Sequence, residues 1–68
     1  MNKITDSDYK IIKKYNINID NNMTIKDILI LINLKILDVG LDNNDEINEK
    51  GIELERLYDR IFYNNKEG

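Results

Sequence analysis

One stretch of the chain, residues 25–41, is apolar enough to organise a fold. Eleven of its seventeen residues are Ile, Leu or Val. Thr24 stands before it with capping-box spacing to Asp27, and residues 24–39 contain neither Gly nor Pro. A long apolar run with a cap and no breaker is typical of a helix, so we predict a helix over 24–39. The alternation within 32–36 leaves a strand as the alternative for that segment.

The predicted helix has two apolar faces when its residues are placed at about 100° intervals. The first face comprises Ile25, Ile28, Leu29, Ile32, Ile36 and Val39. The second face comprises Ile30, Leu34, Leu37 and Leu41. The spacing of the second face, i, i+4, i+7 and i+11, is typical of a packing seam between helices. A helix that is apolar on two sides needs two packing partners.

Weaker signals predict structure on either side of this helix. Residues 1–5 are expected to form a loose tail, and the cap residues Thr5–Ser7 predict a short helix over about 6–15. The alternating segment 16–22 is expected to be an extended clip whose two Ile side chains, at 17 and 19, contact the core, with a strand as the alternative.

After the central helix, Gly40 and the polar residues 42–45 predict a helix end and a turn. The last helix is expected at about 44–64, with a stripe formed by Ile47, Leu54, Leu57, Tyr58, Ile61 and Phe62. Gly51 falls inside this stripe, where it indicates either a close approach of the central helix or a kink.

These elements predict one all-α domain over residues 1–68. In it, the short N-terminal helix and the extended clip pack on a long antiparallel helical hairpin. The first face of 24–39 should pack against the stripe of the last helix. The second face should be covered either by the N-terminal segment or by a second copy of the chain, because so small a domain has little core of its own.

The composition excludes several kinds of chemistry. The chain has 68 residues and no Cys or His, so neither disulfides nor the usual zinc, haem and imidazole chemistry is available. We therefore predict no catalytic residue, no metal and no cofactor. The formal net charge of -3 argues against nucleic-acid binding. The start of the chain does not resemble a secretory signal, and charged residues interrupt the apolar run, so we expect a cytoplasmic protein without a membrane span.

The last helix adds four candidate binding residues to the second face. Glu55 and Asp59 are acidic neighbours at i and i+4 that flank Ile52, and Tyr63 shares the back of the helix with Ile52. An acidic pair of this kind is otherwise a solvated helix surface. The full set of predicted binding residues is Ile30, Leu34, Leu37, Leu41, Ile52, Glu55, Asp59 and Tyr63.

The hairpin resembles one known family. After the Gly40-Leu41 turn, residues 51–55 read Gly-Ile-Glu-Leu-Glu, which resembles the Ser-Gln-Glu-Leu-Asp signature of the sporulation-type aspartyl-phosphate phosphatases. Glu53 and Leu54 match that signature, and Glu55 replaces its Asp. The resemblance implies a helical hairpin that dephosphorylates response-regulator receivers, with Glu55 as the acid.

The function predicted from these features is a small, non-enzymatic protein-binding regulator or inhibitor, with a protein partner or a homodimer at the second face. Ile, Asn and Lys make up 32 of the 68 residues, which indicates a low-GC bacterium or its phage as the source. The alternatives are a phosphatase-like helical hairpin and a small helix-turn-helix protein that binds DNA.

Overall fold

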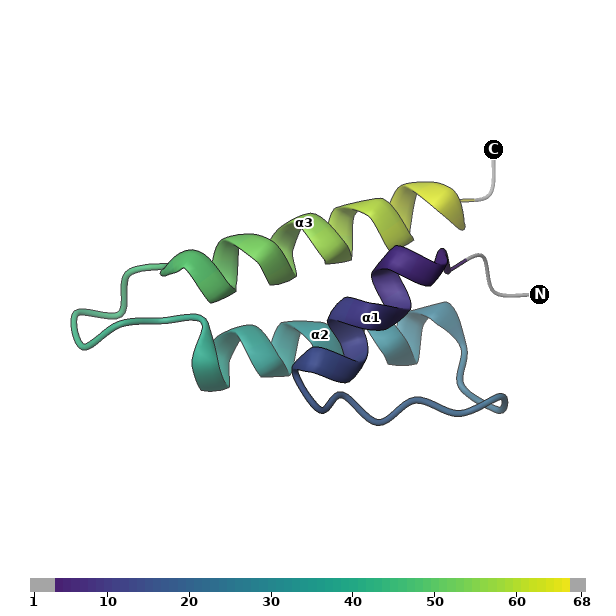
Figure 1. The fold of residues 1–68 in the computed structure, drawn as a ribbon, viewed down its shortest axis with the longest axis horizontal. Helices are drawn as coiled ribbons and strands as arrows, with labels where there is room; N and C mark the ends of the chain where they lie inside the picture. Colours follow the sequence, from purple (N-terminus) through teal and green to yellow (C-terminus); the bar gives the residue numbers. More distant parts are fainter. Residues whose placement is uncertain (1–3, 67–68) are drawn as a thin grey trace.

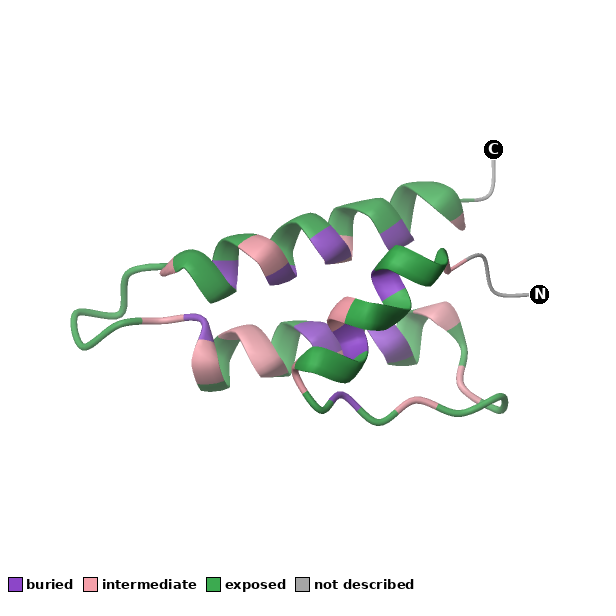
Figure 2. Cartoon of the chain, in the orientation of Figure 1, coloured by how far each residue is buried: buried purple, intermediate pink, exposed green. Residues whose placement is uncertain are grey.

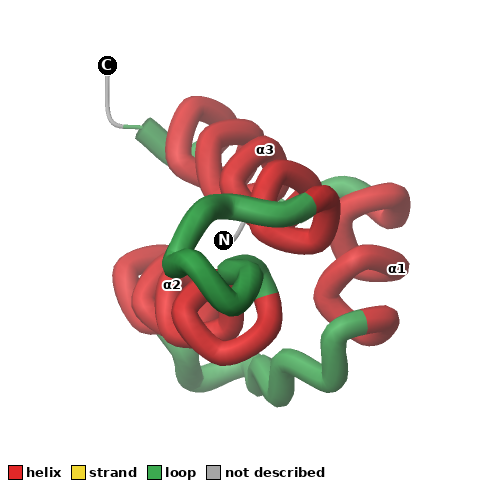
Figure 3. The backbone as a smooth tube through the Cα atoms, turned by 90° about the vertical axis from the view of Figure 1, so that its left-hand side faces the viewer, coloured by secondary structure: helices red, strands yellow, loops and turns green. Residues whose placement is uncertain are grey.

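The computed structural model describes residues 4–66, and its regular elements are three helices. They are α1 (Asp6–Lys14), α2 (Ile25–Val39) and α3 (Glu49–Asn64). α2 and α3 form the predicted hairpin, and α1 lies beside them (Figure 1). Viewed along the hairpin, the three helices stand at the corners of a triangle (Figure 3). The prediction of a small all-α domain is confirmed.

α1 is bounded by two local hydrogen-bond motifs. At its start, the Thr5 hydroxyl accepts a hydrogen bond from the backbone N–H of Asp8 at 3.1 Å. At its end, Asn16 has a φ of 57°, and the N–H of Ile17 donates to the Ile12 carbonyl at 3.0 Å. This left-handed turn is the usual Schellman ending. It folds the chain back so that Ile17 is buried beside Ile12 in the core.

The segments around α1 are more tightly held than a tail and a loose linker would be. Ile4 is half-buried against the core and Thr5 caps the helix, in place of the expected loose tail; residues 1–3 lie outside the described residues. Segment 16–22 forms neither helix nor strand, and Ile19 packs against the same core in which Ile17 is buried. The predicted clip is confirmed.

α2 begins with the predicted capping box. The side chain of Thr24 accepts from the Asp27 N–H at 3.1 Å, and the Asp27 carboxylate accepts from the Thr24 N–H at 3.2 Å. The helix continues without a break through residues 32–36, so the strand alternative for that segment is wrong. The cap and the long apolar run outweigh a local alternation.

α3 begins at Glu49, five residues later than the predicted start at 44. Its cap is Asn48, whose side-chain oxygen accepts from the Gly51 N–H at 2.9 Å. The preceding polar residues form a loop instead, because the Asp42 carboxylate accepts from the N–H groups of Asn44 and Glu46 at 2.8 and 3.1 Å. Short polar side chains can satisfy backbone donors in a turn as well as at a helix start.

Two glycines let the hairpin close at its loop end. A Cβ on Gly40 would lie 2.8 Å from the Gly51 Cα, and a Cβ on Gly51 would meet the Gly40 carbonyl oxygen. Gly40 ends α2 with a φ of -92°, so it serves here through its lack of a side chain and not through a left-handed conformation. The close approach predicted as one explanation of Gly51 is confirmed.

The core joins all three helices. Its buried side chains are Ile12, Ile17, Ile28, Leu29, Ile32, Leu54, Leu57 and Ile61. Figure 2 shows buried positions on all three helices. The first face of α2 therefore packs as predicted. Ile47 departs from the prediction: it precedes α3, forms an antiparallel bridge with Leu41, and is 41% exposed. Within residues 4–66, no helix combines the length and apolar character needed to cross a membrane.

Candidate functional site

The second face of α2 is left uncovered by the rest of the described chain. Ile30, Leu34 and Leu37 are 49%, 55% and 61% exposed. The N-terminal segment was one predicted cover, and this prediction is wrong, since Ile12 and Ile17 are buried in the same core as the first face. Leu34 borders this segment across a hollow of about 330 Å³ that residues 16–18 also line.

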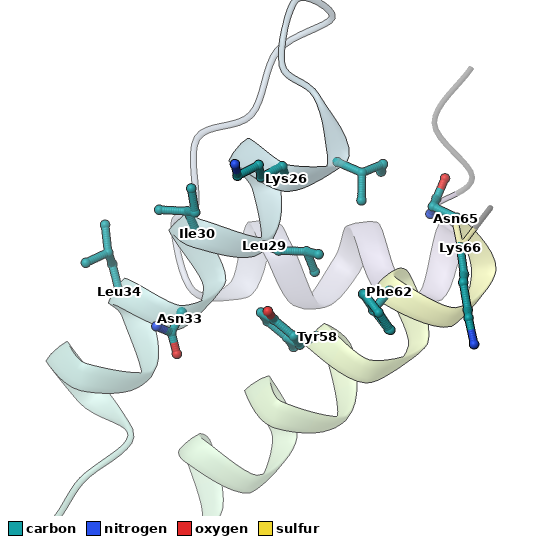
Figure 4. Close-up of a pocket in the computed structure, with 10 residues that line it drawn as sticks. Lys26, Leu29, Ile30, Asn33, Leu34, Tyr58, Phe62, Asn65 and Lys66 are labelled. Carbon is teal, nitrogen blue, oxygen red and sulfur yellow. The ribbon is translucent and has the colours of Figure 1, made fainter.

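Two of the uncovered side chains, Ile30 and Leu34, line a groove between α2 and α3, which we call the α2–α3 groove. Its volume is about 570 Å³. In Figure 4, Leu29, Tyr58 and Phe62 lie between the two helices, and Ile30 and Leu34 lie on the outer side of α2. Phe62 is 44% exposed, so a large aromatic surface is open to the groove.

The charges along the groove are unevenly placed. Lys26, near the start of α2, and Lys66, beyond the end of α3, both line the groove, and its lining among the described residues includes no Asp or Glu. The Lys66 ammonium lies 5.9 Å from the centroid of the Tyr63 ring. Towards the other end, a smaller hollow of about 210 Å³ shares Asn33 and Tyr58 with the groove and is lined by Glu55 and Asp59. The groove thus has a basic end, an apolar middle and an acidic end.

The structure brings some of the predicted binding residues together and separates others. Ile30 and Leu34 line the groove, and Glu55 and Asp59 border its acidic end. Leu41 lies past the end of α2 and pairs with Ile47 in the loop, so it does not extend the second face. Leu37, Ile52 and Tyr63 are exposed but line neither hollow.

Sequence reasoning missed several lining residues. Phe62 was assigned to the core stripe, but it lies at the edge of that stripe and faces the groove. Lys26 and Lys66 carried no signal at all, because single lysines on a helix usually mark a solvated surface. Both line the groove because the antiparallel pairing of α2 with α3 brings the start of one helix beside the end of the other.

A polar cluster lies away from the groove, where α1 meets α3. Glu53 accepts hydrogen bonds from the Lys14 ammonium at 2.9 Å and from the Tyr15 hydroxyl. These two donors, Tyr15 first, hold the pKa of Glu53 below its ordinary value of 4.5. Burial and the bond to Glu53 raise the pKa of Tyr15, and the bond to Glu53 raises the pKa of Lys14. The cluster fastens the end of α1 to α3.

Replacing Glu53 with Gln should therefore change stability in a pH-dependent way. A carboxylate with a lowered pKa stabilises the folded state above its unfolded pKa, and this contribution is lost as the pH falls through the folded pKa. We expect Glu53→Gln to cost about 1 kcal/mol at neutral pH, an amount limited by solvent screening. The cost should disappear well below pH 4.5, as measured by urea unfolding across pH.

Tyr15→Phe supplies the control for this prediction, because it removes the donor with the largest effect on Glu53. In the Tyr15→Phe background, Glu53→Gln should cost less than it does in the wild type. A cost that stays constant from neutral to acidic pH would contradict the assignment. The raised pKa values of Tyr15 and Lys14 have the opposite pH dependence to that of Glu53. Each protonated group stabilises the folded state below its ordinary pKa, 10.0 for Tyr15 and 10.5 for Lys14, and this stabilisation is lost as the group deprotonates at higher pH.

A second polar contact, between Asp8 and Arg60, also joins α1 to α3. Asp8 is only 1% exposed, and its Oδ1 accepts a hydrogen bond from the Arg60 Nε at 2.9 Å. Its Oδ2 is buried and has no hydrogen-bond partner in the described part of the chain. Asp8 does not line the α2–α3 groove. We therefore assign the pair to packing and not to the candidate site.

The described residues offer few groups for chemistry. Among residues 4–66, no three His, Cys, Asp or Glu side chains converge in a way that could hold a metal ion. Of the acids in the phosphatase-like segment, Glu53 is engaged by Lys14 and Tyr15, while Glu55 is exposed. Comparison of the chain with protein-family models, curated proteins and solved structures gives no match. The candidate site therefore rests on the residues of this chain alone.

Proposed function

We propose that the protein is a non-enzymatic binding module, a small cytoplasmic regulator or inhibitor from a low-GC bacterium or its phage. Its contact surface is the α2–α3 groove with the adjoining Ile30 and Leu34. The observation that carries this proposal is the exposure of three large aliphatic side chains on α2, at 49%, 55% and 61%. Contiguous apolar surface that borders a groove and has polar residues at its rim is characteristic of interaction sites.

A protein surface fits this site better than a small molecule does. Small ligands are largely enclosed by concave pockets, whereas Ile30 and Leu34 project from the outer side of α2 beside the groove (Figure 4). A raised apolar wall next to a groove is complementary to another helix, which can pack against the wall and fill the groove. Phe62 and Tyr58 supply aromatic surface of the kind that is enriched at the centres of interfaces.

Site-specific photo-cross-linking tests this proposal. A photoreactive residue at position 34 should form adducts with a protein, whereas the same residue at position 13, exposed on α1, should not. The protein found in the adduct is then purified and titrated with the wild-type chain and with Leu34→Glu. We expect Leu34→Glu to weaken binding at least about tenfold, because it places a charge in an apolar contact. Lys13→Glu is the control and should bind like the wild type.

Two results would contradict the proposal. The first is equal labelling from positions 34 and 13, which would mean that α2 presents no specific surface. The second is hydrolysis of an aspartyl phosphate on a response-regulator receiver that the wild type performs and Glu55→Gln does not. That activity would favour the phosphatase-like alternative, in which Glu55 is the acid.

A further inference from the structure

We propose that a second copy of the chain occupies the α2–α3 groove, related to the first by a two-fold axis perpendicular to α2 and α3. This inference rests on the proposed function, because it takes the groove to be a protein interface and names the partner. The two copies would face each other across their grooves, with the two α2 helices side by side and antiparallel. Each α2 would then cover the exposed Ile30 and Leu34 of the other.

The charges along the groove favour this occupant. Lys26 and Lys66 mark one end, and Glu55 and Asp59 mark the other. A two-fold axis perpendicular to the helices reverses their direction, so the basic end of one groove lies over the acidic end of its partner. Both ends of the interface are then complementary at once, because a two-fold interface uses the same surface twice. Complementary potentials of this kind favour association and set its orientation.

The same charges exclude the other simple two-fold arrangement. An axis parallel to the helices would keep their direction and bring the two basic ends together, with Lys26 and Lys66 of one copy beside those of the other. Like charges facing each other across an interface are unfavourable. The position of Asn33 and Tyr58, which line both hollows, places the perpendicular axis near the middle of the groove.

The size of the chain also favours a second copy. The chain has a mass of 8.1 kDa, and the described core contains eight buried side chains. Domains this small commonly gain stability by association. A specific interface buries about 800 Å² on each partner, which is a modest part of the total surface of 5267 Å². Burying Ile30, Leu34 and Phe62 would supply the apolar centre of such an interface.

Sedimentation equilibrium with paired charge reversals tests the dimer. The wild type at micromolar concentration should sediment at twice its mass of 8.1 kDa. Lys26→Glu/Lys66→Glu places acidic groups at both ends of the groove, and Glu55→Lys/Asp59→Lys places basic groups at both ends. Each variant should dimerise at least about tenfold more weakly than the wild type, since like charges then face each other.

Mixing the two variants in equal amounts provides the decisive measurement. In the mixed pair, acidic ends face basic ends again, so the dimer mass should return. The control is Lys10→Glu/Lys50→Glu, which makes the same change in net charge at exposed positions outside the groove and should dimerise like the wild type. Far-ultraviolet circular dichroism checks that every variant is helical before it is compared.

Three outcomes would overturn the dimer: a monomeric wild type, charge reversals that leave dimerisation unchanged, or a mixture that stays monomeric. None of them decides the proposed function, because cross-linking from position 34 to a different protein would still identify the groove as an interface. If the chain is monomeric and position 34 also gives no specific cross-link, both the dimer and the proposed function are contradicted. This arrangement is supported if the wild type is a dimer, Lys26→Glu/Lys66→Glu is mainly a monomer, and the mixture of the two variants is again a dimer.

Discussion

Replacing Arg60 with Met should lower the free energy of unfolding by about 2 to 4 kcal/mol. Arg60 donates to the Oδ1 atom of Asp8 at 2.9 Å, and the Asp8 side chain is 2% exposed. Methionine keeps most of the apolar stem of arginine but removes the cation. The Asp8 carboxylate would then be buried without a counter-charge, and its Oδ2 already has no partner among the described residues. Urea unfolding at neutral pH measures the loss.

The pair should be replaceable as a unit although neither partner is dispensable alone. The Asp8 carboxylate is buried while the Arg60 side chain is 45% exposed. Because burying a charge costs desolvation, apolar residues of similar size often substitute for such a pair at little cost. The double variant Asp8→Leu/Arg60→Met should therefore regain stability to within about 1 kcal/mol of the wild type. Arg56→Met, at an exposed position one turn earlier on α3, is the matched control. A loss no larger in Arg60→Met than in this control would contradict the structural role of the pair.

Gly51→Ala should also destabilise the fold, by about 2 kcal/mol. The sign is informative, since alanine in an open helix interior is favoured over glycine by about 1 kcal/mol. In this structure the added Cβ would lie 2.5 Å from the Ile47 Cγ1 and would meet the Gly40 carbonyl oxygen. That carbonyl is held in place by the Asn48 N–H at 2.8 Å. The end of α2 would have to move away from α3, which would loosen the closed end of the hairpin.

Lys50→Ala is the control for this prediction, because it alters the same helical turn at an exposed position. It should change the free energy of unfolding by no more than about 0.5 kcal/mol. Thermal and urea unfolding of the two variants should agree in direction. If Gly51→Ala is more stable than the wild type, the backbones at Gly40 and Gly51 do not approach closely. A kink in α3 would then be the explanation of Gly51.

Several elements could be predicted from sequence because their signals are local. The capping box at Thr24 and Asp27 and the period of the first apolar face depend on neighbours within a few turns, and both occur in the structure. The late start of α3 was missed for the same reason. Asp42, Asp45 and Asn48 are all good cap residues, and only the loop that Asp42 organises leaves Asn48 as the cap.

The candidate site was only half predictable. The second face of α2 follows from helical spacing, so Ile30 and Leu34 could be named in advance. The sequence could not predict whether that face would be covered, because its cover depends on where the N-terminal segment packs. That segment is held against α3 by the contacts of Asp8 with Arg60 and of Lys14 with Glu53. The Schellman turn at Asn16 then directs the chain that follows. These contacts join residues far apart in the chain.

The sequence by itself determined that three helices form, the first face of α2 and the presence of a second face. Those properties arise from hydrogen bonds and side-chain periodicity within one segment. Tertiary structure alone decided that the second face stays exposed, that Phe62 opens onto a groove, and that lysines from α2 and the end of α3 share one end of it. The physical reason is that burial and electrostatic complementarity depend on distances between segments, which the antiparallel packing of α2 and α3 sets.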